Sequence, residues 1–156
     1  MKTRRDIPVI QFTKEGYDAV KKKHDELLVD RGAAVADLSK ARDMGDLSEN
    51  GWYKAAKFKL GFIDRQLREL KHQIQYGKVS QEKNTGIVSV GSSVLLVSRG
   101  NEERYSIVGE YEGNPAEKKL SSVSPLGKAL LGKKVGDKIA VSVPAGMSSY
   151  TILKIT

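Results

Sequence analysis

Three carboxylates lie close together in the first half of the chain, in a segment flanked by basic residues. They are Asp43, Asp46 and Glu49, and no lysine or arginine occurs between Asp43 and Tyr53. Carboxylate oxygens suit Mg²⁺, which usually takes one or two of them from a protein while water and substrate phosphates fill its octahedron. Asp46 and Glu49 are therefore candidate ligands for a magnesium ion whose other ligands belong to a partner or its nucleic acid.

The same segment also has a purely structural interpretation. Gly45 can end one helix in the left-handed conformation, and Asp46 can cap the next helix with Glu49 completing a capping box. Both interpretations place Asp46 and Glu49 at the start of a helix, so their spacing does not decide between them. The elements on either side of the segment decide where these carboxylates lie.

Two series of residues with alternating spacings of three and four flank the acidic segment, and this rhythm is typical of coiled coils. The first series is Tyr17, Val20, His24, Leu27, Arg31, Ala34, Leu38 and Ala41, and the second is Tyr53, Ala56, Leu60, Ile63, Leu67, Leu70 and Ile74. If the two series pair antiparallel, Val20 faces Ile74 and Ala41 faces Tyr53, and the two residue numbers of every such pair add up to the same total. A constant total is what an antiparallel hairpin requires, because the facing positions run in opposite directions. The centre of symmetry is Leu47, so the acidic segment forms the tip of an arm roughly 45 Å long.

The second half of the chain changes to short β-type runs separated by turns. Strands are predicted around 88–97, 105–108, 139–143 and 150–155, and residues 78–86 are predicted to be a linker. Ser124 and Pro125 begin one short helix, as N-cap and first helical residue. The predicted fold class is α+β, with an antiparallel helical hairpin domain in residues 1–79, an acidic tip at 43–50, and a small antiparallel sheet domain with one helix in residues 80–156.

The composition narrows the class of protein further. The chain has 27 basic and 19 acidic residues, a net charge of +8, which suits either a polyanionic partner or simply a soluble basic surface. It has no cysteine, which excludes disulfides and thiolate metal sites. Neither a secretory signal nor a membrane-spanning segment is predicted, so we expect a cytoplasmic protein that does not associate with membranes.

Three segments closely resemble the motifs of the Gre transcript-cleavage factors, the GreA type in particular. The tip motif is Arg42-Asp43-Met44-Gly45-Asp46-Leu47-Ser48-Glu49-Asn50 followed by Tyr53-Lys54-Ala55-Ala56-Lys57, the opening helix is Phe12-Thr13-Lys14-Glu15-Gly16-Tyr17, and the third motif begins Ser124-Pro125-Leu126-Gly127-Lys128-Ala129. The resemblance covers nearly the whole chain, with the three motifs in the family's order.

This resemblance implies an N-terminal coiled coil and an FKBP-like C-terminal domain. It implies a factor that enters the secondary channel of bacterial RNA polymerase and stimulates the polymerase's own Mg²⁺-dependent cleavage of backtracked RNA, without being an enzyme itself. Asp46 and Glu49 would share the catalytic Mg²⁺ with the polymerase, Arg42 and Lys57 would contact the nascent RNA 3′ end, and Asp43, Asn50 and Tyr53 would support the tip. The acting form would be a monomer.

One departure from the family pattern lies beside the tip. Family members usually carry Ala-Glu after the asparagine, whereas this chain has Gly51-Trp52. Trp52 then either packs on the coil or contacts polymerase or RNA. Two alternative functions stay open: a channel binder that regulates or inhibits without cleavage, and an FKBP-like prolyl isomerase or chaperone, for which the few aromatic residues of the second half are a poor fit.

Overall fold

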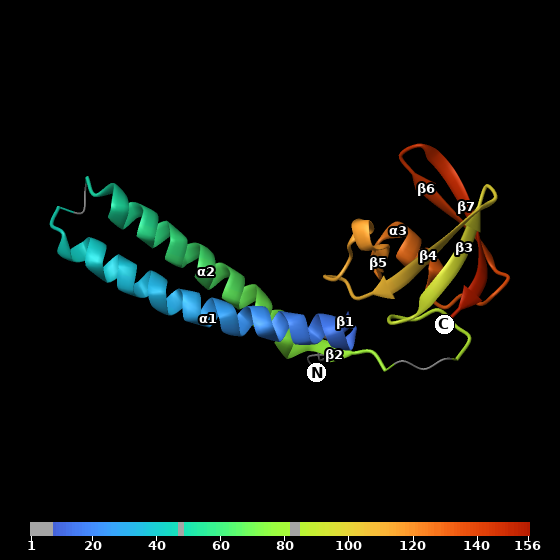
Figure 1. Ribbon diagram of the computed structural model, residues 1–156, viewed down its shortest axis with the longest axis horizontal. Coiled ribbons are helices and arrows are strands. Elements are labelled where there is room, and N and C mark those ends of the chain that lie inside the picture. The colour runs from blue at the N-terminus through green and yellow to red at the C-terminus, as the bar shows by residue number, and fades with distance from the viewer. Residues whose placement is uncertain (1–7, 47–48, 82–84) are drawn as a thin grey trace, which may run out of the picture. The chain divides into compact units, whose positions relative to one another are not determined.

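The structure is a computed structural model of the 156-residue chain, and it describes residues 8–46, 49–81 and 85–156. The predicted α+β architecture is confirmed: two long helices are followed by a curled, mostly antiparallel sheet (Figure 1). The chain forms two compact units. One is the hairpin, Asp18–Tyr76, and the other joins the residues up to Tyr17 to Gly77–Thr156.

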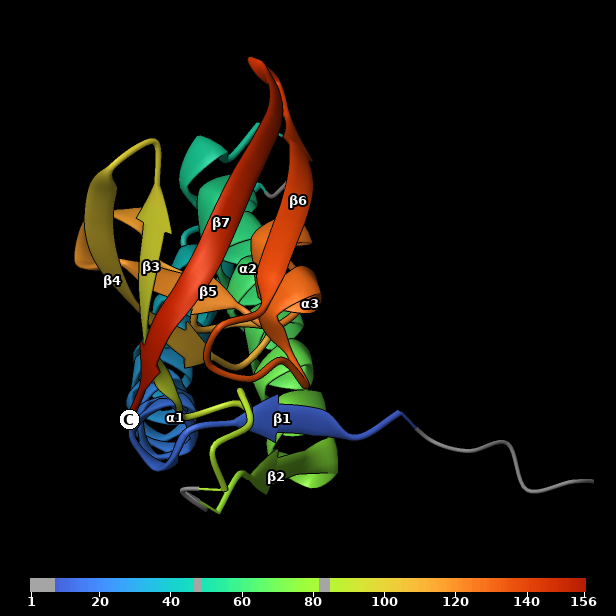
Figure 2. The same ribbon diagram turned by 90° about the vertical axis from the view of Figure 1, so that its right-hand side faces the viewer.

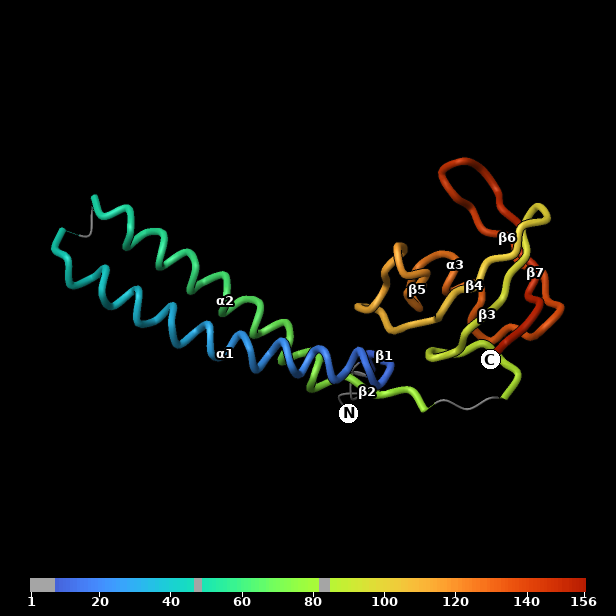
Figure 3. Tube along the Cα trace, viewed as in Figure 1, coloured from blue at the N-terminus to red at the C-terminus, as the bar shows by residue number. Residues whose placement is uncertain are grey.

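The hairpin consists of α1 (Lys14–Asp43) and α2 (Gly51–Tyr76), which run side by side in opposite directions (Figure 3). Its seam lies on the residues that the heptad rhythm predicts. Every predicted seam residue is buried or half-buried except Arg31, whose Nε donates to Asp64 Oδ1 at 2.6 Å. The central cluster contains Ala34, Ile63 and Leu67, with Leu27 and Leu60 packed against them. The predicted antiparallel register is therefore correct, although its centre, Leu47, lies outside the described residues.

The boundaries of α1 follow from local chemistry. Thr13 caps the helix as predicted, because its Oγ1 accepts a hydrogen bond from the Gly16 N–H at 3.1 Å. At the other end, Gly45 has a φ of 107°, a conformation that a residue with a Cβ rarely adopts. Lys40 and Arg42 in the last turn lie close to the partial negative charge of the helix end.

The sheet unit contains five hydrogen-bonded strands in the order β5-β4-β3-β7-β6, and its neighbours are antiparallel except for the parallel pair β4–β5. The strands are β3 (Ser93–Ser98), β4 (Asn101–Val108), β5 (Lys119–Ser121), β6 (Lys138–Val143) and β7 (Gly146–Ile155). A short 3-10 helix, η1 (Pro115–Glu117), precedes β5. The predicted antiparallel sheet is therefore confirmed for β4, β3, β7 and β6, and the short parallel strand β5 is an addition that the sequence pattern missed.

The core of this unit lies between the curled sheet and helix α3 (Pro125–Leu130). Ser124 caps α3 as predicted, because its Oγ accepts from the Gly127 N–H at 3.1 Å. The buried side chains are Val88, Val94, Leu96, Ile107, Leu130, Ile139, Val141 and Ile152. The domain division at residues 79 and 80 and the FKBP-like character stay predictions.

Two further strands lie where the sequence predicted none. β1 (Ile10–Phe12) and β2 (Gly77–Val79) lie side by side (Figure 2). They pair in parallel, and Ile10 lies opposite Gly77. The predicted linker 78–86 is therefore wrong at its start, and residues 82–84 lie outside the described part of the chain. Of the described residues, no helix is long and apolar enough to cross a membrane.

Candidate functional site at the hairpin tip

The chain reverses between α1 and α2, and the acidic segment lies at this reversal. Five of the described residues line one surface hollow there: Met44, Asp46, Glu49, Asn50 and Trp52. Asp46 and Glu49 are both exposed. The structure thus places the two candidate metal ligands beside the same open space, while Leu47 and Ser48 lie outside the described residues.

Asn50, and not Asp46, caps the second helix. Its Oδ1 accepts a hydrogen bond from the Tyr53 N–H at 3.0 Å, and its Nδ2 donates to the carbonyl oxygen of Ala41 at 2.9 Å. The capping box predicted for Asp46 and Glu49 is therefore wrong, because α2 begins at Gly51 and the cap is the residue directly before it. Helix α2 therefore begins at Gly51 with Asn50 as its N-cap.

Asn50 also ties the two helices together at the tip. Ala41 belongs to the last turn of α1 and is fully buried, so the hydrogen bond from Asn50 fixes the start of α2 against the end of α1. Glu49 immediately precedes Asn50. The partial positive charge of the α2 N-terminus favours a carboxylate at this position, and the first turn of α2 itself contains no acidic residue.

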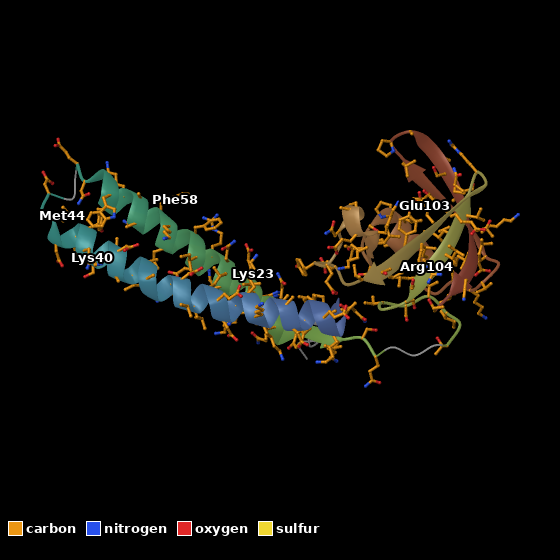
Figure 4. All side chains as sticks on the ribbon, viewed as in Figure 1. Lys23, Lys40, Met44, Phe58, Glu103 and Arg104 are labelled. Carbon is orange, nitrogen blue, oxygen red and sulfur yellow. The ribbon has the colours of Figure 1, made fainter. Side chains whose placement is uncertain are left out.

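The remaining predicted site residues lie around the hollow and are not among those that line it. Arg42 and Asp43 end α1 and are exposed, Tyr53 is half-buried in the seam, and Lys57 is exposed one turn further along α2. Figure 4 labels Met44 at the tip and Phe58 further along α2.

Sequence reasoning did not assign Met44 and Trp52 to the hollow. They are 69% and 44% exposed. Side chains on a helix lean toward its N-terminus, so a residue in the first turn of α2 covers the loop before the helix. Applied to Trp52, that rule predicts a side chain beside the acidic segment.

The donor atoms of the tip fit Mg²⁺ in type but not in number. Carboxylate oxygens are suitable ligands, and the amide of Asn50 is already engaged at both of its polar atoms. Within the described part of the chain, no three histidine, cysteine, aspartate or glutamate side chains gather closely enough to hold a metal ion. A magnesium ion at this tip would need ligands from another molecule.

The sheet unit offers a second hollow, lined by Leu96, Ser98, Arg99, Asn101, Glu103, Tyr105, Ser148 and Tyr150. Two tyrosines contribute rings, but charged and hydroxyl groups make up much of the lining. Lys118 Nζ donates to Glu103 Oε2 at 3.1 Å and lies 5.5 Å from the centre of the Tyr105 ring. This polar lining does not favour the prolyl isomerase hypothesis, which needs an aromatic, apolar pocket.

Comparison with known proteins shows the class to which this hairpin and sheet belong. Residues 10–79 match the family model described as transcription elongation factor, N-terminal, and residues 82–156 match the one described as transcription elongation factor, GreA/GreB, C-term. The protein class is thus that of transcription elongation factors. The chain belongs to the GreA/GreB family.

Curated relatives agree along almost the full length. Transcription elongation factor GreA of Thermoanaerobacter pseudethanolicus is 41% identical over 89% of this chain and 94% of that protein. GreA of Pelobacter propionicus is 40% identical over 94% of this chain and 96% of that protein. Among solved structures, Thermus aquaticus Gfh1 is 25% identical, with a TM-score of 0.46 over 96% of this chain and 99% of that one.

Proposed function

We propose that this protein binds bacterial RNA polymerase through the polymerase's secondary channel and stimulates Mg²⁺-dependent cleavage of backtracked nascent RNA. The observation that carries the proposal is the tip hollow, which Asp46 and Glu49 line together at the end of a helical hairpin. Membership of the GreA/GreB family supports a role on a transcribing polymerase. Cleavage would release the displaced RNA 3′ end and allow elongation to resume.

The two carboxylates supply what the tip can contribute to such a site. Asp46 and Glu49 would complete the ligand set of a magnesium ion that the polymerase holds in part, since the described tip residues are too few to hold it alone. Magnesium held in this way would supply Lewis-acid chemistry at the phosphodiester, and the part of Asp46 and Glu49 would be to bind and orient it. Asn50 would keep the carboxylates in place through its hydrogen bonds to Ala41 and Tyr53.

Exposed cations near the tip fit contacts to the RNA backbone. Arg42 ends α1 and Lys57 lies on α2, and both are exposed. Each would contact phosphates of the displaced RNA and so position it without reading its sequence. The protein would act as a monomeric, cytoplasmic cofactor, and the bond cleavage itself would belong to the polymerase.

A cleavage assay on backtracked polymerase complexes tests the proposal. Stalled complexes carrying end-labelled RNA are incubated with Mg²⁺ and the protein, and the RNA lengths are measured. Wild-type protein should shorten the RNA, and Asp46→Ala combined with Glu49→Ala should abolish the stimulation. The matched control is Asp30→Ala combined with Glu69→Ala, which removes one aspartate from α1 and one glutamate from α2 at exposed positions away from the tip.

The competing hypothesis is a channel binder that regulates without cleavage, and Trp52 in the tip hollow is the observation that favours it. The same assay separates the two functions. Wild-type protein that binds the complexes, measured by co-migration on a native gel, but leaves the RNA intact would establish the regulator. Cleavage that survives the double substitution at the tip would refute the role of Asp46 and Glu49.

A further inference from the structure

Trp52 is the one tryptophan of the chain, and it lies next to the two carboxylates of the tip. It is the second residue of α2 and its side chain is 44% exposed. An indole ring is among the largest apolar surfaces that a side chain can offer, and at the end of the hairpin part of this surface is open to a partner.

Trp52 is not one of the residues that form the seam of the hairpin, and part of its side chain is uncovered. The seam near the tip is formed by the buried residues Ala41 and Ala56 and by the half-buried Tyr53, the neighbour of Trp52. Trp52 lines the hollow in front of α2, as expected for a first-turn side chain that leans toward the helix N-terminus. The exposed thioether of Met44 lines the same hollow, which therefore has apolar and acidic groups together.

The charges of the tip restrict which part of an RNA strand could contact the indole. Asp46 and Glu49 repel a phosphate group that lies directly against them, whereas an uncharged base suffers no such repulsion. The cations that attract phosphates, Arg42, Lys54 and Lys57, lie on the helices that flank the tip and are exposed. Basic residues along a path with an aromatic ring at its end are the usual means of binding single strands, through phosphate contacts and base stacking.

We propose that Trp52 is a stacking platform for one unpaired base of the displaced RNA 3′ segment. The inference rests on the proposed function and adds a positioning residue to it. Stacking holds the nucleotide at the tip, so that the phosphodiester to be cleaved would lie near the magnesium ion that Asp46 and Glu49 help to hold, and not directly against the two carboxylates. The contact does not depend on base identity, because every base offers a π face.

Substitutions that separate stacking from apolar packing provide the first test. Trp52→Leu keeps an apolar side chain and removes the aromatic face, and it should lower the cleavage rate about 5- to 100-fold, the range expected for loss of one base–aromatic stack. Trp52→Phe should retain most of the rate. The matched control is Phe58→Leu, since Phe58 is an aromatic residue of the same helix, 78% exposed, that does not line the hollow.

An RNA lacking the stacked base provides the second test. Backtracked complexes are prepared with an abasic nucleotide at each displaced position in turn, and the cleavage rates of wild type and Trp52→Leu are compared. At one position the two proteins should cleave at the same rate, because the base that stacks on Trp52 is missing. If the difference persists at every position, the tryptophan contacts the polymerase and the inference is wrong. Equal rates for wild type and Trp52→Leu on ordinary RNA would also overturn it.

Photo-crosslinking keeps the inference separate from the proposed function. Displaced RNA carrying 4-thiouridine is irradiated in the complex, and the crosslinked peptide is identified by mass spectrometry. We expect a crosslink to Trp52 that Trp52→Leu abolishes and Phe58→Leu preserves. A crosslink without cleavage would refute the proposed function and leave the platform standing, whereas cleavage without this crosslink would refute the platform alone.

Discussion

Asn50 shows how one side chain can organise the tip of the hairpin through two hydrogen bonds. Its amide accepts from the N–H of Tyr53 and donates to the carbonyl of Ala41, so it satisfies one group at the start of α2 and one near the end of α1. A carboxylate at this position could accept but not donate. The asparagine is therefore the residue that can bridge both helices, and Asp46 and Glu49 are not needed for capping.

Tyr105 has the largest perturbation of pKa among the described residues. Burial is the main cause, and the hydrogen bond from its hydroxyl to Glu103 and the negative charge of that residue add to it, which raises the pKa of Tyr105 to about 12. The same hydrogen bond, followed by the contact with Lys118, lowers the pKa of Glu103.

We predict that Glu103→Gln lowers the pKa of Tyr105 while leaving it above 10.0, because burial, the largest cause, remains. Ultraviolet titration of tyrosinate, with Tyr105→Phe subtracted, measures it. Since the folded pKa of Tyr105 exceeds the unfolded value, its contribution to the free energy of unfolding is complete below pH 10.0 and is lost as the pH rises toward about 12. The control is Glu102→Gln, an exposed neighbour; an equal shift in both variants would contradict the assignment.

Residue types predicted the candidate site better than its local geometry. The proximity of Asp46 and Glu49 follows from their spacing, and both line the hollow. The error was the cap: aspartate and asparagine have similar capping preferences, so Asp46 and Asn50 are equivalent from the sequence. Asn50 is the cap in the structure, and its amide also donates to the carbonyl oxygen of Ala41. These two residues are nine positions apart, so a local sequence pattern could not predict this hydrogen bond.

At the scale of elements, the hairpin was predictable and the short strands were not. The heptad rhythm extends over both helices, so many residues agree on one register. β1, β2 and β5 have three residues each, too few for a periodic pattern, and Ile10 of β1 pairs with Gly77 of β2, far away in the chain. These strands form because of tertiary contacts, and the β-propensity of their residues does not predict such contacts.

The close packing of the hairpin seam limits the size of the side chain that position 34 can hold. Ala34 is 1% exposed and packs with Leu27, Leu60, Ile63 and Leu67. Ala34→Leu should lower the free energy of unfolding by about 1–3 kcal/mol, because the larger side chain must displace these neighbours or separate the helices. Urea unfolding followed by circular dichroism measures the change.

Ala33→Leu is the control for this substitution. Ala33 is adjacent in sequence but exposed, so the same chemical change there should alter the free energy of unfolding by no more than about 0.5 kcal/mol. Similar effects at Ala33 and Ala34 would show that the seam does not run where the structure places it.

At the scale of the whole molecule, one carboxylate joins the start of the chain to a loop of the sheet unit. Glu112 accepts hydrogen bonds from the N–H of Thr13 at 2.9 Å, from the N–H of Gly109 at 2.8 Å, and from the Thr13 hydroxyl. Phe12, fully buried, lies against the ring of Tyr111, with ring centres 6.5 Å apart. These contacts explain why the residues up to Tyr17 group with the sheet unit.

Two glycines make room for this connection. A Cβ on Gly16 would collide with the carboxylate of Glu112, and a Cβ on Gly109 would collide with the backbone oxygen of Gln11. Gly16 belongs to the opening-helix segment that resembles the Gre motif. The structure gives a physical reason for glycine at this position, because a side chain would collide with the carboxylate of Glu112. The contact itself was not predictable, since Thr13 and Glu112 are 99 residues apart.

We predict that Glu112→Ala lowers the free energy of unfolding of the sheet unit by about 1–3 kcal/mol, because two half-buried N–H groups lose their acceptor. The amides of Thr13 and Gly109 should then exchange faster with deuterium, as NMR can measure. Gly16→Ala should act in the same direction without removing the charge, since its Cβ must displace the carboxylate. Glu110→Ala, which removes an exposed charge two residues away, should leave both amides protected. Unchanged exchange at Thr13 in the Glu112→Ala protein would mean that other contacts, such as Phe12 against Tyr111, suffice to hold the start of the chain.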